Sequence, residues 1–417
     1  MKKDHFVDCN DEGAEFVEAQ VVDDVELMDL IAKIKSEQLN DHLLSRQSYE
    51  VDEATDPLLS IQITEFKCGG RVISITVSHR IADASSIGTF IAVWSSINNA
   101  NNSVITISPT FNSHLLFPGK NMGYDFEPPR TRDPTTVVKH LLFNKEAITS
   151  LRSKLRPKNF SRVRLVSALI SKALIGVDRL KHGKLRSCFI AQAVNMRERT
   201  FPPLPNFSIG NLDLVYLISD AINKTVNDCA KILSLGEDGH NIIIDPVANL
   251  VERSMSGEIN VLWFSDWSKI GFYEADFGWG KPFWAGIGTM PGQNLTVLMN
   301  DQEGDGIEAW VHLNHNDLIY FEQDDDLKMF TVKPNNPSAD DILLNANLTF
   351  ASSTRNHTSS SAVPWVRTHE GLREFLMGES IRGGEFVEKF IHTILVFEIS
   401  TVVVLEARKI SNHFLYL

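Results

Sequence analysis

Hydrophobic positions recur along the chain with two different periods, and each period predicts one kind of secondary structure. In residues 71–78, Ile73, Ile75 and Val77 stand at every second position, which is typical of a strand with one buried face. In residues 24–36, apolar side chains stand three and four positions apart, which predicts a helix. The same criteria predict further strands at 139–143, 186–194, 258–263, 295–299 and 307–313, and helices at 145–155 and 164–180.

Two stretches without such a period divide the chain. Residues 118–134 hold four prolines and two glycines, so we interpret them as a crossover linker between a lobe at 1–117 and a second lobe at 135–332. Asn, Ser, Thr and Pro dominate the first part of the remaining segment, 333–417. Such a composition buries little apolar surface, and we expect an atypical, partly disordered tail.

Composition and charge narrow the classes of partner. Hydrophobic residues make up 43% of the 417 positions, which is enough for a substantial core. The formal net charge is −13 and no cluster of Lys and Arg stands out, which argues against nucleic-acid binding. The four cysteines lie far apart without a C-x-x-C pair, which favours free thiols in a reducing compartment over disulfides or a zinc site.

The sequence also argues against secretion and membrane insertion. Residues 1–10 are charged, unlike a signal peptide. The longest apolar run, 390–405, is interrupted by His392 and Glu398 and is shorter than the roughly 18 uninterrupted apolar residues that a membrane span needs. We expect a cytoplasmic monomer. The alternative is a tail anchor at 390–405, which Glu398 would penalise by about 2.5 to 3.5 kcal/mol.

The strongest local feature is the segment HRIAD at residues 79–83, which follows the strand predicted at 71–78. The apolar positions that come next have helical spacing, so His79 lies between the end of a strand and the start of a helix. An imidazole held there by packing, with one nitrogen facing a cleft, has the geometry of a general base. The alternative is a core histidine without a chemical role.

Asp83 stands at the start of this predicted helix. In one interpretation it is the N-cap, which stabilises a helix by about 1 kcal/mol. In the other it pairs with a cation and fixes the segment that carries His79. We favour this second, positioning role over proton transfer by Asp83.

A second feature is DFGWG at residues 276–280. Gly278 and Gly280 flank Trp279, which predicts a fixed loop with the indole used for packing. Asp276 is either an acid that handles protons or a buried salt-bridge partner, and the sequence favours the structural role.

Two further segments carry charge without a decisive pattern. Residues 194–199, VNMRER, contain Arg197 and Arg199. Three interpretations of these arginines stay open: they pair with acids, they contact a phosphate, or they belong to a solvated strand end. DQEGDG at residues 301–306 imitates a calcium loop, but the twelfth position is His312 where a bidentate Glu is needed. We interpret it as a hairpin turn and predict no metal site.

Taken together, in this order and separation, the HxxxD motif at 79–83 and the DFGWG motif at 276–280 resemble the plant BAHD family of acyl-CoA-dependent acyltransferases. The strings VNMRER, PPLP, GN and GDGIEAWV are similar to that family as well. The resemblance covers about residues 2–327. The segments around both motifs are most similar to members that acylate alkaloid and terpenoid alcohols.

The resemblance implies a two-lobe α/β fold of the chloramphenicol acetyltransferase type, with mixed sheets flanked by helices and a solvent channel between the lobes. It also implies acyl-CoA, with acetyl-CoA expected, as co-substrate, and a small-molecule alcohol or amine as acceptor. His79 would be the general base, Asp83 would orient its segment, and Asp276 is a secondary catalytic candidate. The four other loop residues would be structural: Phe277, Gly278, Trp279 and Gly280.

The chain departs from the family pattern at both ends. Family members begin further upstream, with a strand and a helix that ends in a segment like LAGR, so we expect a truncated and incomplete first lobe. Residues 333–417 have no counterpart in the resemblance. The alternative to an active enzyme is therefore a catalytically inactive relative that binds a ligand or partner, or is a non-functional product. A carrier-protein condensation domain is a third interpretation, but such domains usually show a doubled histidine where this chain has Ser78 and His79.

Overall fold

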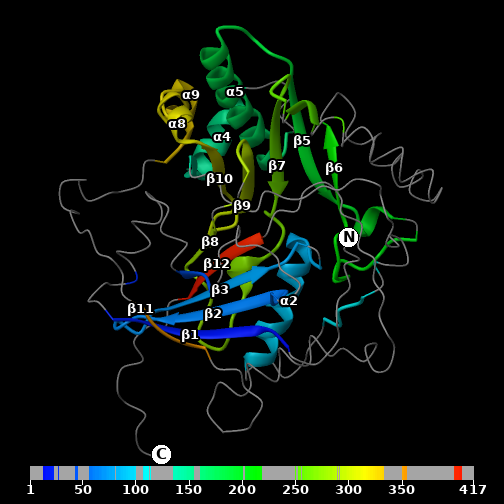
Figure 1. Ribbon diagram of the computed structural model, residues 1–417, viewed down its shortest axis with the longest axis vertical. Helices are drawn as coiled ribbons and strands as arrows, with labels where there is room; N and C mark the ends of the chain where they lie inside the picture. Colours follow the sequence, from blue (N-terminus) through cyan, green and yellow to red (C-terminus); the bar gives the residue numbers. More distant parts are fainter. Residues whose placement is uncertain are drawn as a thin grey trace, which may run out of the picture.

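The computed structural model contains two six-stranded sheets, which lie one above the other in Figure 1. It describes residues 13–22, 27, 43–45, 56–79, 81–99, 107–111, 113, 135–154, 160–200, 202–217, 249, 252–254, 256–288, 290, 292–332, 350–354 and 399–405. Among these residues, no helix is both long and apolar enough to cross a bilayer.

The lower sheet in Figure 1 carries the strand that leads to His79. Its strand order is β11-β1-β2-β3-β12-β8. The strands are β1 (Glu15–Val21), β2 (Leu59–Glu65), β3 (Arg71–Val77), β8 (Trp284–Ile287), β11 (Phe350–Thr354) and β12 (Ile399–Leu405). β1 and β2 run parallel, and the other neighbouring pairs are antiparallel. β2 and β3 are buried along almost their whole length, so β3 has two buried faces and not the single one that its alternating pattern predicted. The polar side chains on these strands are buried as well: Ser60, Gln62, Thr64, Ser74 and Thr76.

The upper sheet has the order β4-β10-β9-β7-β5-β6. Its strands are β4 (Thr136–Phe143), β5 (Cys188–Asn195), β6 (Asp213–Leu217), β7 (Asn260–Asp266), β9 (Leu295–Asn300) and β10 (Ile307–Asn314). β5, β7 and β9 are parallel neighbours, so their carboxyl ends lie along one edge of the sheet. In open α/β sheets this is the edge at which ligands bind.

Each longer helix begins at a residue whose side chain accepts a backbone N–H, which satisfies one of the free donors of the first turn. The helices are α2 (Ala84–Asn98), α4 (Lys145–Ser153), α5 (Arg162–His182), α8 (His315–Phe321) and α9 (Asp325–Phe330). Their caps are Asp83, Asn144, Ser161, Asn314 and Asp324. α2 packs beside the lower sheet, whereas the other four helices cover the outer side of the upper sheet (Figure 1).

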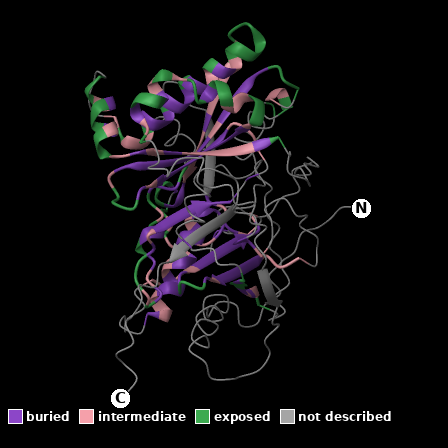
Figure 2. Cartoon of the chain, turned by 90° about the vertical axis from the view of Figure 1, so that its left-hand side faces the viewer, coloured by how far each residue is buried: buried purple, intermediate pink, exposed green. Residues whose placement is uncertain are grey.

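Two large hydrophobic cores follow from this arrangement, and Figure 2 shows buried layers along the sheets. The strand β10 separates them, because its side chains alternate between its faces. Trp310 belongs to the core that contains β2, β3 and α2, whereas Ala309 and Val311 belong to the core under α4 and α5.

The hydrophobic pattern predicted most of the upper sheet. The strands predicted from 71 onward and the helices predicted at 145–155 and 164–180 are confirmed, with ends that differ by a few residues. The helix predicted at 24–36, apart from Leu27, and the linker at 118–134 lie outside the described residues. Two short strands in the predicted tail, β11 and β12, pair with β1 and with β3 and β8. The rest of that tail also lies outside the described residues.

The boundaries of the two lobes stay a prediction. β8, β11 and β12 all join the lower sheet although they come from beyond residue 117. The lower sheet therefore contains strands from both predicted lobes and from the predicted tail.

Candidate active site

His79 follows the carboxyl end of β3 and is half-buried. Its Nδ1 lies 2.9 Å from Oδ1 of Asn211. The amide nitrogen of Asn211 donates a hydrogen bond of 2.5 Å to the backbone carbonyl oxygen of His79. One side chain thus contacts both the ring and the backbone of His79.

These two contacts determine which ring nitrogen carries the proton. A backbone carbonyl only accepts, so the amide nitrogen of Asn211 faces it and the amide oxygen faces the ring. Because that oxygen also only accepts, Nδ1 of the neutral imidazole carries the hydrogen, and Nε2 keeps a free lone pair.

Burial lowers the pKa of His79 below its usual value of 6.5. The effect of burial outweighs a backbone hydrogen bond, the charge of Asp83 and the bond to Asn211, which all raise this pKa. The imidazole is therefore neutral near pH 7, with Nε2 able to accept a proton.

Asp83 forms a buried ion pair with Arg197. The guanidinium donates from Nη1 to Oδ2 at 2.9 Å and from Nη2 to Oδ1 at 2.8 Å. The side chains of Asp83 and Arg197 are 1% and 0% exposed, so the two charges compensate each other away from the protein surface. Asp83 also caps α2, because its Oδ1 accepts the backbone N–H of Ser86 at 2.8 Å. Both structural interpretations of Asp83, helix cap and partner of a cation, are present at this one residue.

The ion pair keeps Asp83 ionised. Burial alone would raise the pKa of Asp83, but the charge and hydrogen bonds of Arg197 and the backbone N–H groups of Leu212 and Ser86 lower it below its usual 3.8. An acid with a lowered pKa does not donate protons near pH 7. Loss of either partner would leave an unpaired buried charge, which costs roughly 3–5 kcal/mol.

The ion pair is one of several contacts that join the start of α2 to the chain after β5. Asn195, at the end of β5, donates to the hydroxyl of Ser85 at 2.8 Å. The hydroxyl of Ser86 donates to the carbonyl oxygen of Gly210 at 3.0 Å. These contacts fix the backbone that carries Asn211 beside the HxxxD segment.

Residues 276–280 form a closed loop. Oδ1 of Asp276 accepts the backbone N–H of Gly278 at 2.8 Å and that of Gly280 at 3.1 Å. Both glycines have positive φ, 91° and 112°, in the region that side chains disfavour. Phe277 packs edge-on against Trp94 of α2, with ring centroids 4.7 Å apart.

Two contacts place this loop at the opposite end of the lower sheet from His79. A Cβ on Gly278 would lie 3.6 Å from the backbone at the carboxyl end of α2, and the guanidinium of Arg71, the first residue of β3, lies 4.8 Å from the ring centre of Trp279. At about 1.5 Å per residue the 15 residues of α2 span roughly 22 Å, and β3 has a similar length. Asp276 thus lies on the order of 20 Å from His79, too far to act on the same reacting atoms.

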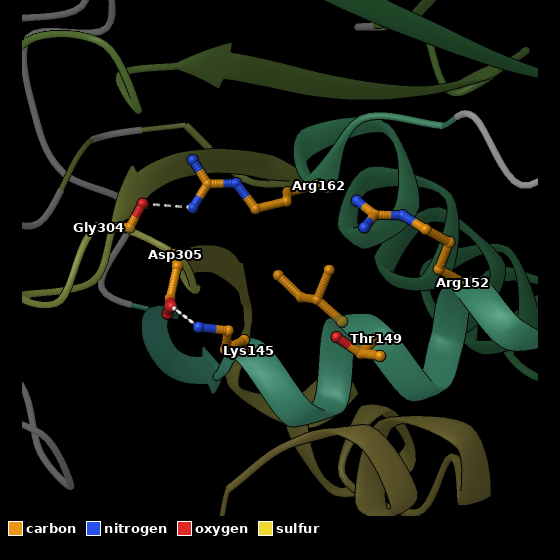
Figure 3. Close-up of a pocket in the computed structure, with 7 residues that line it drawn as sticks. Lys145, Thr149, Arg152, Arg162, Gly304 and Asp305 are labelled. Atoms are coloured by element: carbon orange, nitrogen blue, oxygen red, sulfur yellow. Dashed lines mark hydrogen bonds and ion pairs between the residues drawn. The ribbon is translucent and has the colours of Figure 1, made fainter.

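A cavity of about 270 Å³ lies between α4, the start of α5 and the turn that joins β9 to β10 (Figure 3). Its lining residues are Lys145, Ile148, Thr149, Arg152, Arg162, Gly304 and Asp305. Lys145 pairs with Asp305 at 2.8 Å, whereas Arg162 donates to the carbonyl oxygen of Gly304 at 2.6 Å. The lining thus holds three cations and one acid, and the charges of Glu146 and Glu303 also act on Lys145.

Comparison with known proteins identifies the family. The model of the Transferase family matches residues 2–328, which include both motifs and every residue of the site. The chain belongs to this family. It is the family of BAHD acyltransferases that the motifs resemble, so the chain is a BAHD acyltransferase.

Two curated relatives and one solved structure illustrate the match. A malonyltransferase of Salvia splendens, named pelargonidin 3-O-(6-caffeoylglucoside) 5-O-(6-O-malonylglucoside) 4'''-malonyltransferase, is 41% identical over 79% of this chain and 82% of its own. Stemmadenine O-acetyltransferase of Catharanthus roseus is 32% identical over 76% of this chain and 77% of its own. The crystal structure of vinorine synthase, from Rauvolfia serpentina, superposes with a TM-score of 0.63 at 32% identity over 78% of both chains.

These matches confirm the fold class and the acyl donor. The BAHD fold expected from the motifs, an α/β fold of the chloramphenicol acetyltransferase type, agrees with the superposition on vinorine synthase. BAHD acyltransferases use acyl-CoA as co-substrate, and solved structures that share the fold at 15% identity hold coenzyme A.

Sequence reasoning gave no role to Asn211 and left Arg197 among open alternatives. Asn211 is 132 positions from His79, and no spacing rule connects an amide in a turn to a distant histidine. The only available signal was the string GN, which the BAHD resemblance already contained. The cation cavity was missed because Lys145, Arg152 and Arg162 look like ordinary surface residues of two helices.

Proposed function

We propose that this protein transfers an acyl group from acyl-CoA to a hydroxyl or amine of a plant specialised metabolite, with His79 as general base. The observation that carries the proposal is the pair of bonds from Asn211, which leaves Nε2 of His79 free to accept a proton. His79 as a whole residue is half-buried, so it is not sealed off from solvent.

The reaction needs one base that works in both directions. Nε2 of His79 takes the proton from the acceptor as its oxygen or nitrogen attacks the thioester carbonyl carbon. The tetrahedral intermediate collapses with cleavage of the carbon–sulfur bond, and the imidazolium returns the proton to the thiolate. The products are the ester or amide and free coenzyme A, and His79 is neutral again.

The other motif residues have supporting roles in this proposal. Asp83, paired with Arg197, positions the HxxxD segment and takes no part in proton transfer. Asp276 closes the DFGWG loop through two backbone N–H groups at a distance from His79 that argues against a proton-handling role. Phe277, Gly278, Trp279 and Gly280 shape that loop.

The cation cavity is our candidate for the phosphate groups of coenzyme A. It borders the turn after β9, and the end of β9 lies two strands, on the order of 10 Å, from the end of β5, the strand that leads to Arg197. Arg152 and Arg162 supply guanidinium groups, a kind of group that binds phosphate oxygens in pairs. Arg162 also donates to the carbonyl oxygens of Gly304 and Gly306 and to Oδ1 of Asn300, so a phosphate would share it with this turn. Lys145 adds a third cation beside Asp305.

The expected acyl group is acetyl, in line with the acetyltransferase among the relatives. Malonyl is a second candidate, because the relative with 41% identity is a malonyltransferase. A carboxylate on the acyl group would need a cation near His79, so the two donors differ in the charge that the site must accommodate.

The test is acyl transfer by the purified 417-residue chain. The enzyme is incubated with acetyl-CoA or malonyl-CoA and a panel of alkaloid and terpenoid alcohols and amines. Mass spectrometry identifies acylated products by their increase in mass. An acylated product supports the proposal. A chain that melts cooperatively but forms no product with either donor would favour the inactive relative. Size-exclusion chromatography and cell fractionation of the same chain test the expected cytoplasmic monomer.

A further inference from the structure

A short extended segment, residues 207–212, carries Asn211, and Thr110 holds it from the side opposite Asp83. Thr110 forms an isolated parallel bridge with Ser208. The N–H of Thr110 donates to the carbonyl oxygen of Phe207 at 3.3 Å. The carbonyl oxygen of Thr110 accepts the N–H of Ile209 at 2.8 Å. The two hydroxyl oxygens lie 3.0 Å apart. Ser208 is fully buried, so its hydroxyl relies on Thr110 in place of water.

The backbone directly before Asn211 has little room to move. Gly210 has a φ of 134°, and a Cβ placed on it would lie 2.5 Å from Oγ of Ser113. On its other side, the carbonyl oxygen of Gly210 accepts Nη2 of Arg197 at 3.1 Å. The segment is thus held between the Thr110 side and the buried ion pair.

The contacts of Asn211 with His79 depend on this placement. The bonds of 2.9 Å and 2.5 Å run from the two ends of a single amide, so a displacement of the segment by about 1 Å breaks at least one of them. Without the amide oxygen beside Nδ1, the hydrogen of the neutral ring is no longer fixed on that nitrogen.

We propose that Thr110 and Ser208 are positioning residues for acyl transfer: their hydroxyl pair clamps the segment that holds Asn211 against His79, and so keeps Nε2 of His79 free to accept a proton. This inference rests on the proposed role of His79 as general base.

Two substitutions at Thr110 isolate the hydroxyl. Thr110→Val removes it at nearly constant volume, and Thr110→Ser keeps it. We expect Thr110→Val to lower kcat roughly threefold to tenfold, the effect of losing one hydrogen bond, with an unchanged KM for acyl-CoA, and Thr110→Ser to retain the wild-type kcat. Ser208→Ala should repeat the effect of Thr110→Val from the other side of the bond.

The pH profile separates positioning from simple destabilisation. The bond to Asn211 raises the pKa of His79, so a loosened Asn211 moves the acid limb of kcat to lower pH. Loss of stability alone would lower the amount of folded enzyme and leave this limb in place. Thr331, directly after α9, donates its hydroxyl to the carbonyl oxygen of Leu327 within that helix. Thr331→Val removes this hydroxyl as a matched control, and it should change neither kcat nor the acid limb of its pH profile.

The deciding comparison uses Asn211→Ala as a second background, with kcat calculated per folded enzyme. If Thr110 acts through Asn211, Thr110→Val has no further effect on kcat in that background. Equal fold losses in both backgrounds, or an unshifted acid limb, would overturn the proposal. His79→Ala in the same assay keeps the two claims apart. Wild-type activity in His79→Ala would refute the role of His79 as general base. Lost activity in His79→Ala together with normal activity in Thr110→Val would refute only the role of Thr110 and Ser208.

Discussion

The amide of Asn211 and the imidazole of His79 meet at 2.9 Å although 132 positions separate them in the sequence. The same amide donates to the backbone of His79, so its orientation is determined independently of the ring. This relationship makes the protonation of Nδ1 a consequence of the fold. It also links the chemistry to the Asp83–Arg197 pair, which holds the neighbouring backbone.

Substitution of Asn211 should move the acid limb of kcat in a direction set by the new side chain. The base is active when His79 is neutral, so activity is lost as pH falls through its pKa. Asn211→Ala removes a bond that raises this pKa, and the limb moves to lower pH. Asn211→Asp places a carboxylate beside the imidazolium, which raises the pKa and moves the limb to higher pH. Initial rates between pH 5 and pH 9 measure both shifts. If the acid limbs of Asn211→Ala and Asn211→Asp move in the same direction, the amide oxygen of Asn211 does not face Nδ1, and the assigned tautomer is wrong.

Removal of the charge of Asp83 should destabilise the protein more than it changes the chemistry. Asp83→Asn leaves the guanidinium of Arg197 buried without a counter-charge, and we expect a loss of roughly 3–5 kcal/mol in the free energy of unfolding. Urea denaturation followed by tryptophan fluorescence measures it. Glu258→Gln, in the exposed pair with Arg253, is the control and should leave the midpoint unchanged. Equal midpoints for both variants would contradict the structural role of Asp83.

The pair should also leave a signature in the pH dependence of stability. The pKa of Asp83 is lower in the folded chain than its usual 3.8, so its contribution is present above that value and is lost as pH falls through the folded pKa. We expect the unfolding free energy of the wild type to fall more steeply than that of Asp83→Asn below about pH 4. Parallel curves would show that Asp83 is not ionised in the fold.

Asp276 should matter for the loop and not for proton transfer. Asp276→Ala removes the acceptor of two backbone N–H groups, which costs about 1–3 kcal/mol of stability. Asp276→Asn keeps an acceptor oxygen in place and should be milder. Because the loop lies on the order of 20 Å from His79, kcat per folded enzyme should stay within about twofold in both variants. A loss near that of His79→Ala would instead assign Asp276 to the chemistry.

The hydrophobic pattern predicted the elements whose period is clear, but it could not predict contacts between distant segments. Local sequence patterns were sufficient for β3, α4, α5 and β10. Their apolar residues recur at the period of a strand or a helix, and α4 and α5 begin at capping residues. The strands β1 and β12 owe their place to neighbours far away in the sequence. The site divides in the same way. HxxxD marks His79 and Asp83 locally, whereas the contacts of Asn211 and Arg197 with this motif become visible only in the fold.

The cation cavity makes a prediction about the acyl donor. Arg162→Met should raise KM for acetyl-CoA about tenfold, the effect of losing one charge-assisted phosphate contact, without lowering kcat. A short thioester that lacks the nucleotide, acetyl-N-acetylcysteamine, should be used equally well by the wild type and the variant. Arg164→Met, on an exposed position of the same helix, is the control. If KM rises equally for acetyl-CoA and for acetyl-N-acetylcysteamine, the phosphate groups of coenzyme A do not bind in this cavity.

The most direct test of the account is the rate of coenzyme A release by His79→Ala compared with the wild type, at pH 8 with saturating acetyl-CoA and an accepted alcohol. General base catalysis contributes about 100-fold to 10,000-fold, so we predict a loss of at least about 100-fold with an unchanged melting temperature. A folded His79→Ala protein that retains a rate within a few-fold of the wild type would contradict the role of His79.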